Sequence, residues 1–392
     1  MSGNDTLGIL PLDADDALLV GRVWDPRTGG PRIVSVRGGQ VYDLTDTVNT
    51  VSELLDRADA ADIVGSPAQQ PRWQLSELVA ASVAEDPTRP HLLAPIDLQV
   101  VKACGVTFVE SMIERVIEEK CAGDSSRAAE VRTLVLEALG GSLASLRPGS
   151  DAAARTKEVL LAQGMWSQYL EVGIGPNPEV FTKAPVLSSV GFGARVGIPT
   201  FSAWNNPEPE LVLVADSRGE VRGATLGNDV NLRDVEGRSA LLLGMAKDNN
   251  ASSAIGPFIR LFDSVFTIDT LRTEEIVLTV SGIDGYCLQG QNSVARISRP
   301  FEELVTATRG AHHQYPDGFA LFTGTLFSPT QDRGEEGLGF THEPGDIVNI
   351  QSEHLGSLRN VTGITEELPP WTFGIRALHS YLSNLLPVEE RV

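Results

Sequence analysis

The sequence predicts an α+β protein with a mixed, mostly antiparallel rolled β-sheet core, a helical insertion and a small N-terminal domain. Three observations support this prediction. Strand-like segments outnumber helices in the second half of the chain, and few strands are separated by helices, which argues against a doubly wound sheet. Three helical patterns lie together at about residues 110–172, between strand-rich parts. A short α+β segment precedes a proline-containing stretch near residue 95.

Composition limits the classes of partner. The chain has 392 residues, 42% of them hydrophobic, so it can bury a large core. Its formal net charge is -21 and its pI is about 4.7. Such an acidic chain repels phosphate backbones and anionic lipid, so neither nucleic acid nor membrane is an expected partner. An anionic small substrate would need a local cation in order to bind.

Cysteine usage predicts the compartment. Cys104, Cys121 and Cys287 have no metal-ligand spacing, and a sparse, odd count is typical of reduced thiols in a cytoplasm. There is no charged-then-apolar leader and no apolar run of about 18 residues. We therefore expect a soluble, unprocessed cytoplasmic protein.

The N-terminal part is expected to form an accessory domain over residues 1–95, followed by a catalytic domain over 96–392. Gly38-Gly39 predicts a hairpin turn. Pro87 to Pro95 is the expected linker. The expected elements are strands over 17–24 and 32–44 and helices over 50–61 and 75–84.

The helical insertion follows an apolar strand over residues 100–108. Met112, Ile113, Val116 and Ile117 then share one helix face. Asp124-Ser125 is the expected N-cap of a second helix, and residues 152–172 are expected to form a third.

The remaining chain is expected to be rich in strands. Asn231 and Asp234 are candidate caps for a helix over 240–247, and residues 276–282 and 293–297 are expected to pair as a hairpin. Further strands are expected over 179–185, 321–326 and 347–352, with a helix from about residue 299.

An acidic stretch organises this second half. Glu208 and Glu210 lie two residues apart before an apolar run, so on an extended strand they project from the same face. A turn over 216–220 and a returning strand over 221–226 bring Asp229 back toward them. Three hard oxygen ligands favour Mg2+, with Mn2+ or Ca2+ as substitutes. The alternative is a polar strand end with solvated acids.

Four other residues have both a functional and a structural interpretation. Lys247 is either a substrate-carboxylate anchor or base, or a solvated helix-end lysine. Lys183, in an otherwise apolar strand, either compensates the acidic cluster or lies on an edge strand. Glu179 either joins the carboxylates or simply begins a strand, and Thr325 either presents its hydroxyl to an anion or forms an ordinary turn.

Motifs for other chemistries are missing from the sequence. It contains no Gly-x-Ser-x-Gly elbow, no P-loop and no dinucleotide fingerprint. Among the six histidines, only the adjacent His312-His313 pair is close in sequence, and two neighbours on one strand do not chelate easily.

The order and spacing of several short motifs resemble the fumarylacetoacetate hydrolase family over roughly residues 100–385. The matching segments are Glu208-Pro209-Glu210, 227–237, Lys247, Gly324-Thr325 and Pro344-Gly345-Asp346. The resemblance implies the rolled sheet of that family. It also implies that Glu208, Glu210 and Asp229 hold a divalent cation, usually Mg2+, and that Lys247 and the Gly324-Thr325 pair contact substrate.

One departure from the family pattern concerns the lid. Members that cleave carbon–carbon bonds usually carry a His/Glu pair there, but this chain has Ser111 at the histidine position and keeps Glu114. Without the imidazole a hydrolytic water lacks its general base. The window 105–115 and residues 181–185 instead resemble the dehydratase branch, which acts on 2-keto-3-deoxy-D-xylonate or related pentonates in oxidative pentose catabolism, as in D-xylose degradation, and yields 2-oxoglutarate semialdehyde.

The resemblance implies an elimination in which a 2-oxo acid chelates Mg2+ and loses its C3 proton and C4 hydroxyl. The expected C3 base is Glu114 or Lys247, Glu179 assists departure of hydroxide, and Ser111 orients the lid carboxylate. The candidate substrate-binding residues are Lys183, Lys247, Ser189, Thr325 and Arg115. The family tendency implies a homodimer or homotetramer.

Two rival functions follow from the same residues. A hydrolase or decarboxylase of the same fold would act on an acylpyruvate-type 2,4-dioxo acid. A non-enzymatic acidic scaffold would use the carboxylates only to bind Ca2+.

Overall fold

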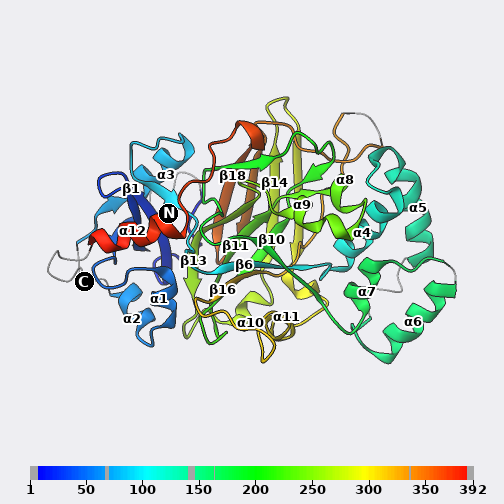
Figure 1. The fold of residues 1–392 in the computed structure, drawn as a ribbon, viewed down its shortest axis with the longest axis horizontal. Helices are drawn as coiled ribbons and strands as arrows, with labels where there is room; N and C mark the ends of the chain where they lie inside the picture. The colour runs from blue at the N-terminus through cyan, green and yellow to red at the C-terminus, as the bar shows by residue number, and fades with distance from the viewer. Residues whose placement is uncertain (1–7, 67–69, 140–145, 163, 335–336, 386–392) are drawn as a thin grey trace.

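The computed structural model describes residues 8–66, 70–139, 146–162, 164–334 and 337–385. β-Strands occupy the middle of the molecule, the N-terminal elements and the C-terminal helix lie at one end, and α4 to α7 lie at the other (Figure 1). No helix among the described residues is long and apolar enough to cross a membrane.

The main sheet has the order β4-β3-β2-β1-β13-β11-β10-β16-β6-β7, with β5 paired to β1. All its neighbours are antiparallel except β16 and β6. The expected mixed, mostly antiparallel α+β architecture is confirmed, and the described strands form no closed barrel. The strands are β1 Leu19–Asp25, β2 Gly30–Arg37, β3 Gln40–Asp43, β4 Trp73–Gln74, β5 His91–Leu93, β6 Val100–Gly105, β7 Glu179–Ala184, β10 Pro209–Ala215, β11 Val221–Asp229, β13 Ser253–Leu261 and β16 Phe319–Phe322.

A second sheet, ordered β15-β14-β17-β18-β8, packs on one face of the main sheet. Alternate residues of β10 enter two different cores: Leu211 and Leu213 face the second sheet, and Val212 and Val214 face the opposite side. Burial on both faces explains why this strand is a continuous apolar run. The other strands are β8 Arg195–Ile198, β9 Asn205–Asn206, β12 Asn231–Leu232, β14 Glu275–Ser281, β15 Cys287–Ser293, β17 Ile347–Ser352 and β18 Gly356–Ile364.

The N-terminal strands continue the main sheet, because β1 pairs with β13. The predicted hairpin turn is confirmed: Gly38 and Gly39 have φ of 55° and 75° between the paired strands β2 and β3. The expected helix over 50–61 is instead two, α1 Val51–Asp56 and α2 Ala60–Gly65, because Arg57 is extended. α3 spans Leu75–Val83, and the expected linker contains β5. The domain boundary at residue 95 stays a prediction.

The helical insertion consists of α4 Val109–Cys121, α5 Ala128–Leu139, α6 Asp151–Ala162 and α7 Gln168–Ile174. Asp124 caps a 3-10 turn over Ser125–Arg127 that leads into α5. The expected third helix is divided, since Ser167 begins α7 as a separate N-cap. Buried Met112, Val116, Val135 and Leu170 join these helices in a core of their own.

Two other expectations are wrong. The partner of β14 is β15 over Cys287–Ser293, not residues 293–297. The helix over 240–247 is a 3-10 turn, Ala240–Leu242, followed by α9 Leu243–Lys247, and its cap is Ser239 rather than Asn231 or Asp234. The other helices are α8 Arg233–Glu236, α10 Ile268–Leu271, α11 Phe301–Thr308 and α12 Ile375–Leu385, with 3-10 turns at Val294–Arg296 and Thr365–Glu367.

Candidate metal centre

Three carboxylates meet at the open end of the β10–β11 hairpin. Glu208 precedes β10, Glu210 lies in it and Asp229 ends β11. The strand register places Glu210 opposite Gly227, and the Asp229 amide donates to the Glu208 carbonyl at 3.1 Å. One ligand oxygen from each acid lies within 4.8 Å of the other two, and all three residues are buried. The hairpin thus brings together the three acids proposed as metal ligands.

Gly324 supports Glu210 from the segment that follows β16. Its amide donates to Glu210 Oε2 at 2.7 Å, and its φ of +97° suits glycine. Thr325 does not present a free hydroxyl, because its Oγ1 donates to the Phe327 carbonyl at 2.9 Å. In this arrangement Gly324 supports a carboxylate ligand, while the Thr325 hydroxyl is used in a local turn.

Two buried lysines flank the carboxylates. Lys247 Nζ lies 2.5 Å from Glu208 Oε2 and 3.2 Å from Asp229 Oδ2. Lys183 Nζ lies 2.8 Å from Asp229 Oδ1 and donates to the Lys247 carbonyl at 2.5 Å. Lys183 does lie on the edge strand β7 and Lys247 does end α9, but both side chains are buried, so neither is a solvated lysine.

Arg115, from α4, contacts the other oxygen of Glu208. The same guanidinium lies 2.6 Å from Glu118 Oε2 and 3.2 Å from Glu236 Oε2. Glu236 in turn lies 3.9 Å from Lys247 Nζ. The helical insertion therefore supplies a cation directly to the acidic centre.

Glu114 is placed differently from its expected position at the reacting centre. Its carboxylate is 2.6 Å from Arg132 and 2.8 Å from Arg233, and among the described residues it has no contact with the three acids. Ser111 does not orient it, because the Ser111 hydroxyl donates to the Phe108 carbonyl at 2.9 Å within its own helix. Glu114 thus links α4 to α5 and α8, and Ser111 bonds within the first turn of α4.

Glu179, at the start of β7, lies over Gly105 of the adjacent strand. The two residues are register partners, and a Cβ added to Gly105 would lie 1.9 Å from Glu179 Oε2. Among the described residues its carboxyl group has no hydrogen bond or ion pair. Burial raises the pKa of Glu179, and the nearby charges of Arg115 and Lys247 oppose that shift. Glu179 is therefore a partly buried acid that holds its proton more tightly than a solvated carboxyl group does, within reach of the charges of Arg115 and Lys247.

Electrostatics favour a further cation at the three acids. Burial, and then the charges of Asp229 and Glu208, raise the pKa of Glu210 well above its ordinary value. Burial disfavours the charged form of Lys247 and so lowers its pKa. The negative charges of Asp229, Glu208 and Glu236 outweigh this effect and raise the pKa overall. Five acids and three bases share this region, so two negative charges are uncompensated if all are ionised. The five acids are Glu179, Glu208, Glu210, Asp229 and Glu236, and the three bases are Arg115, Lys183 and Lys247. Three oxygen ligands with that excess charge fit a divalent cation.

The sequence interpretation missed Glu236 and Tyr169. The Tyr169 hydroxyl, from α7, donates to the Glu236 carbonyl at 3.2 Å. Glu236 follows Arg233 by three positions on one helical turn, and this spacing was the available signal that both face the insertion. Ser189 lies farther out, where its hydroxyl is 3.0 Å from Ser253, the register partner of Asp229.

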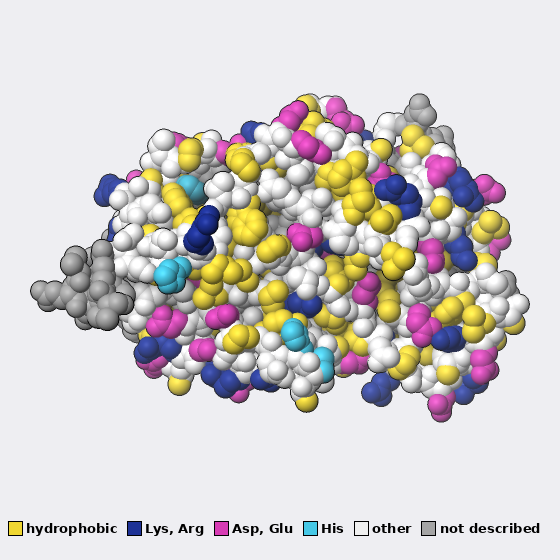
Figure 2. Space-filling view, in the orientation of Figure 1, with side chains coloured by type: hydrophobic (Ala, Val, Ile, Leu, Met, Phe, Trp, Pro, Cys, Tyr) yellow, Lys and Arg dark blue, Asp and Glu magenta, His cyan; other side chains and the backbone are white. Residues whose placement is uncertain are grey.

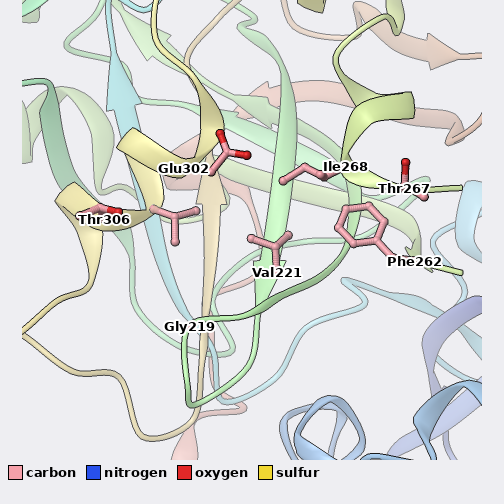
Figure 3. A pocket seen from close by; sticks show the side chains of 8 residues that line it. Gly219, Val221, Phe262, Thr267, Ile268, Glu302 and Thr306 are labelled. Atoms are coloured by element: carbon pink, nitrogen blue, oxygen red, sulfur yellow. The ribbon is translucent and has the colours of Figure 1, made fainter.

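A surface cavity of about 550 Å³ is separate from this centre. It is lined largely by apolar side chains, including Val221, Phe262 and Ile268, with Glu302 at its edge (Figure 3). None of the three acids or their lysines borders it, so the cavity is not the candidate site.

Comparisons with known proteins agree with this geometry. Residues 171–362 match the model described as fumarylacetoacetate (FAA) hydrolase C-terminal. The chain is 28% identical over 335 residues to a Haloferax volcanii protein named probable 2-keto-3-deoxyxylonate dehydratase, covering 85% of this chain and 96% of that protein. It is 31% identical over 190 residues to the 2-dehydro-3-deoxy-D-arabinonate dehydratase of Saccharolobus solfataricus, covering 48% of this chain and 60% of that protein.

A solved structure shares the fold. It is described as 2-keto-3-deoxy-D-arabinonate dehydratase complexed with magnesium and 2,5-dioxopentanoate, and it matches with a TM-score of 0.60 and 19% identity. The match covers 88% of this chain and 99% of that one. Residues 171–362 of this chain are thus similar to the C-terminal part of fumarylacetoacetate hydrolases.

Proposed function

We propose that this protein is a Mg2+-dependent dehydratase that converts 2-keto-3-deoxy-D-xylonate, or a related 2-keto-3-deoxy pentonate, into 2-oxoglutarate semialdehyde and water. One observation carries the proposal: three buried carboxylates, within 4.8 Å of one another, lie beside Lys247 and near the unpaired acid Glu179. The relative that this chain covers almost completely has a matching name.

Glu208, Glu210 and Asp229 would hold the ion. A bound Mg2+ supplies Lewis-acid stabilisation of negative charge on the 2-oxo group of the substrate. The acids carry excess negative charge, and the ligand atoms they offer are all oxygens. Both properties support Mg2+, with Mn2+ or Ca2+ as substitutes.

The elimination needs one group that takes the C3 proton and one that protonates the leaving C4 hydroxyl. Of the two candidate bases, Lys247 lies beside the three acids, whereas Glu114 is paired with Arg132 and Arg233. Because Asp229, Glu208 and Glu236 raise the pKa of Lys247, it would take the C3 proton only with a bound cation offsetting those negative charges. Glu179 is the proposed acid, since a raised pKa keeps its proton available over a wider pH range. The product of elimination then tautomerises to the C5 aldehyde.

The proposed substrate contacts are less specific. Lys183 is fully buried between Asp229 and backbone carbonyls, which supports a charge-compensating role over direct substrate contact. Ser189, Thr325 and Arg115 are the other candidates. The Thr325 hydroxyl already donates to Phe327, and Arg115 already pairs with three carboxylates, so each would have to give up a present partner to contact the substrate.

A direct assay tests the function. Because neither C2 nor C3 is a stereocentre in a 2-keto-3-deoxy acid, the D-xylonate and D-arabinonate derivatives are one compound. The informative panel is therefore its D and L enantiomers and the hexonate homologue. Purified protein with Mg2+ should release 2-oxoglutarate semialdehyde, detected with an NAD(P)-linked aldehyde dehydrogenase, and EDTA should stop the release.

The rival functions give different results in that assay. With an acylpyruvate added to the panel, a carbon–carbon hydrolase would release pyruvate from it, and this result would overturn the proposal. Ser111, whose hydroxyl is bonded within its helix where hydrolases carry a histidine, argues against that rival. A Ca2+-binding scaffold would show no turnover of any panel member.

We also propose a cytoplasmic homodimer or homotetramer that acts in D-xylose degradation. The three cysteines are free, which suits a reducing compartment. Phe201, Leu241 and Met245 are 46%, 95% and 42% exposed. Hydrophobic side chains also gather over the α8–α9 region in Figure 2, as at many subunit contacts. Light scattering on the purified protein tests the assembly, and a monomer would contradict it.

A further inference from the structure

We infer that Glu236 is a positioning residue of the metal centre, which holds in place the two cations that flank the ligand Glu208. The inference rests on the proposed function, because it takes Glu208 as a metal ligand. Glu236 belongs to the one-turn helix α8 and is buried.

Four side chains form a closed ring of alternating charge. Arg115 contacts Glu208 Oε1, and Lys247 Nζ lies 2.5 Å from Glu208 Oε2. On the far side, Glu236 Oε2 lies 3.2 Å from the Arg115 guanidinium and 3.9 Å from Lys247 Nζ. Each cation therefore lies between the same two carboxylates, and both oxygens of Glu208 are held.

The backbone of Glu236 is fixed independently of this ring. Tyr169, from the helical insertion, donates its hydroxyl to the Glu236 carbonyl at 3.2 Å. Among the described residues, Glu236 Oε2 accepts no hydrogen bond, and the two cations are its ion-pair partners. A buried carboxylate without such partners would be costly, so its position depends on Arg115 and Lys247 as theirs depends on it.

Within the ring, each cation divides its electrostatic attraction among several carboxylates. Arg115 is shared among Glu118, Glu208 and Glu236, and Lys247 among Glu208, Asp229 and Glu236. If Glu236 loses its charge or withdraws, both cations turn more fully to Glu208 and Asp229. They then compete with a metal ion for the oxygens of those two ligands.

Isothermal titration with MgCl2 tests this without measuring turnover. Glu236→Gln removes the charge at nearly constant shape, and Glu236→Asp keeps the charge but withdraws the carboxylate by one methylene. Partners of metal ligands typically contribute 10–100-fold to affinity, so we expect the dissociation constant for Mg2+ to rise roughly tenfold in Glu236→Gln. A smaller rise is expected in Glu236→Asp. Glu367→Gln, which removes an exposed surface charge, should bind Mg2+ like the wild type.

Each outcome is decisive. Weaker binding in both Glu236 variants, with wild-type circular dichroism and partial recovery of kcat at high Mg2+, supports positioning. Wild-type affinity for Mg2+ in Glu236→Gln, or in Glu236→Asp, overturns the inference, because the position and charge of the Glu236 carboxylate would then not affect metal binding. Failure of the wild-type protein to bind Mg2+ would instead refute the proposed function.

Discussion

The carboxylate of Glu179 occupies the space that a side chain at Gly105 would fill. An added Cβ would lie 1.9 Å from Glu179 Oε2 and 2.8 Å from its Cδ. The pairing of β6 with β7 makes these residues register partners. Because Gly105 has no side chain, the carboxylate of Glu179 has room there, where the charges of Arg115 and Lys247 act on its pKa.

Gly105→Ala should lower turnover with little effect on metal binding. The clash falls on the end of a flexible side chain, so Glu179 moves while the backbone stays in place. We expect kcat to fall at least about tenfold, a part of the 10²–10⁴-fold that a positioned acid contributes. Mg2+ affinity by titration should stay within about twofold of the wild type. Gly374→Ala is the matched control, because its Cβ would meet only Trp371 at 3.8 Å. Unchanged kcat in Gly105→Ala would contradict the role of Glu179.

The pH dependence of turnover should report Glu179. Burial raises its pKa above the ordinary 4.5, and only the protonated carboxyl group can donate to the leaving hydroxyl. Activity should therefore decline as pH rises through that raised pKa. Glu179→Gln should lower kcat by about 10²–10⁴-fold and remove this alkaline limb from the kcat profile. An unaltered limb in the variant would assign it to another group.

The β10–β11 hairpin was predictable because its signals are local. Glu208 and Glu210 alternate on a strand whose apolar run must be buried, and the turn over 216–220 fixes how far back Asp229 returns. In contrast, Arg115 and Glu236 come from α4 and α8, which meet only in the folded chain. Nothing near Arg115 in sequence indicates that its partners are Glu208 and Glu236.

The errors also have physical causes. β15, Cys287–Ser293, has only two buried residues and a largely polar sequence, since it lies at the edge of the second sheet. Edge strands need little apolar alternation, so the pattern did not indicate it. The pairing of Glu114 with Arg132 and Arg233, from α5 and α8, also could not be seen in the sequence, and its role toward the substrate stays a prediction.

Glu210→Gln should separate metal binding from folding. Burial and the adjacent acids raise the pKa of Glu210, so its contribution to stability is present below its ordinary pKa of 4.5 and is lost as pH rises through the raised value. At pH 8 in EDTA, the variant should melt at or above the wild-type temperature. Added Mg2+ at 100 times its dissociation constant should stabilise the wild type by about 2.7 kcal/mol and the variant far less. Equal stabilisation of both proteins would exclude Glu210 as a ligand.

Asp346→Asn should destabilise the fold away from the metal. Burial would raise the pKa of Asp346, but hydrogen bonds from His342 and Arg333 hold it at about 2, below the ordinary 3.8. This depressed pKa contributes stability above pH 3.8 that is lost as pH falls toward 2. We expect the substitution to lower the free energy of unfolding by on the order of 2 kcal/mol at pH 7, measured by urea denaturation. Mg2+ affinity should be unchanged, and a loss of affinity with no loss of stability would contradict this assignment.

Lys183→Met should reveal whether that lysine serves the protein or the substrate. Its Nζ is fully buried and lies 2.8 Å from Asp229 Oδ1, so its removal leaves a buried carboxylate with one cation fewer. Breaking a buried pair typically costs about 3–5 kcal/mol, and urea denaturation in EDTA should show a loss of that order. Lys102→Met on the adjacent strand β6 is the control, since Lys102 bonds only Thr182 near the surface and should cost less than about 1 kcal/mol. A Lys183→Met protein of wild-type stability whose KM for the 2-oxo acid rises would instead show that Lys183 binds substrate. In that case the charge of Lys183 would be used by the substrate carboxylate, and the balance of two uncompensated negative charges at the metal centre would have to include that carboxylate.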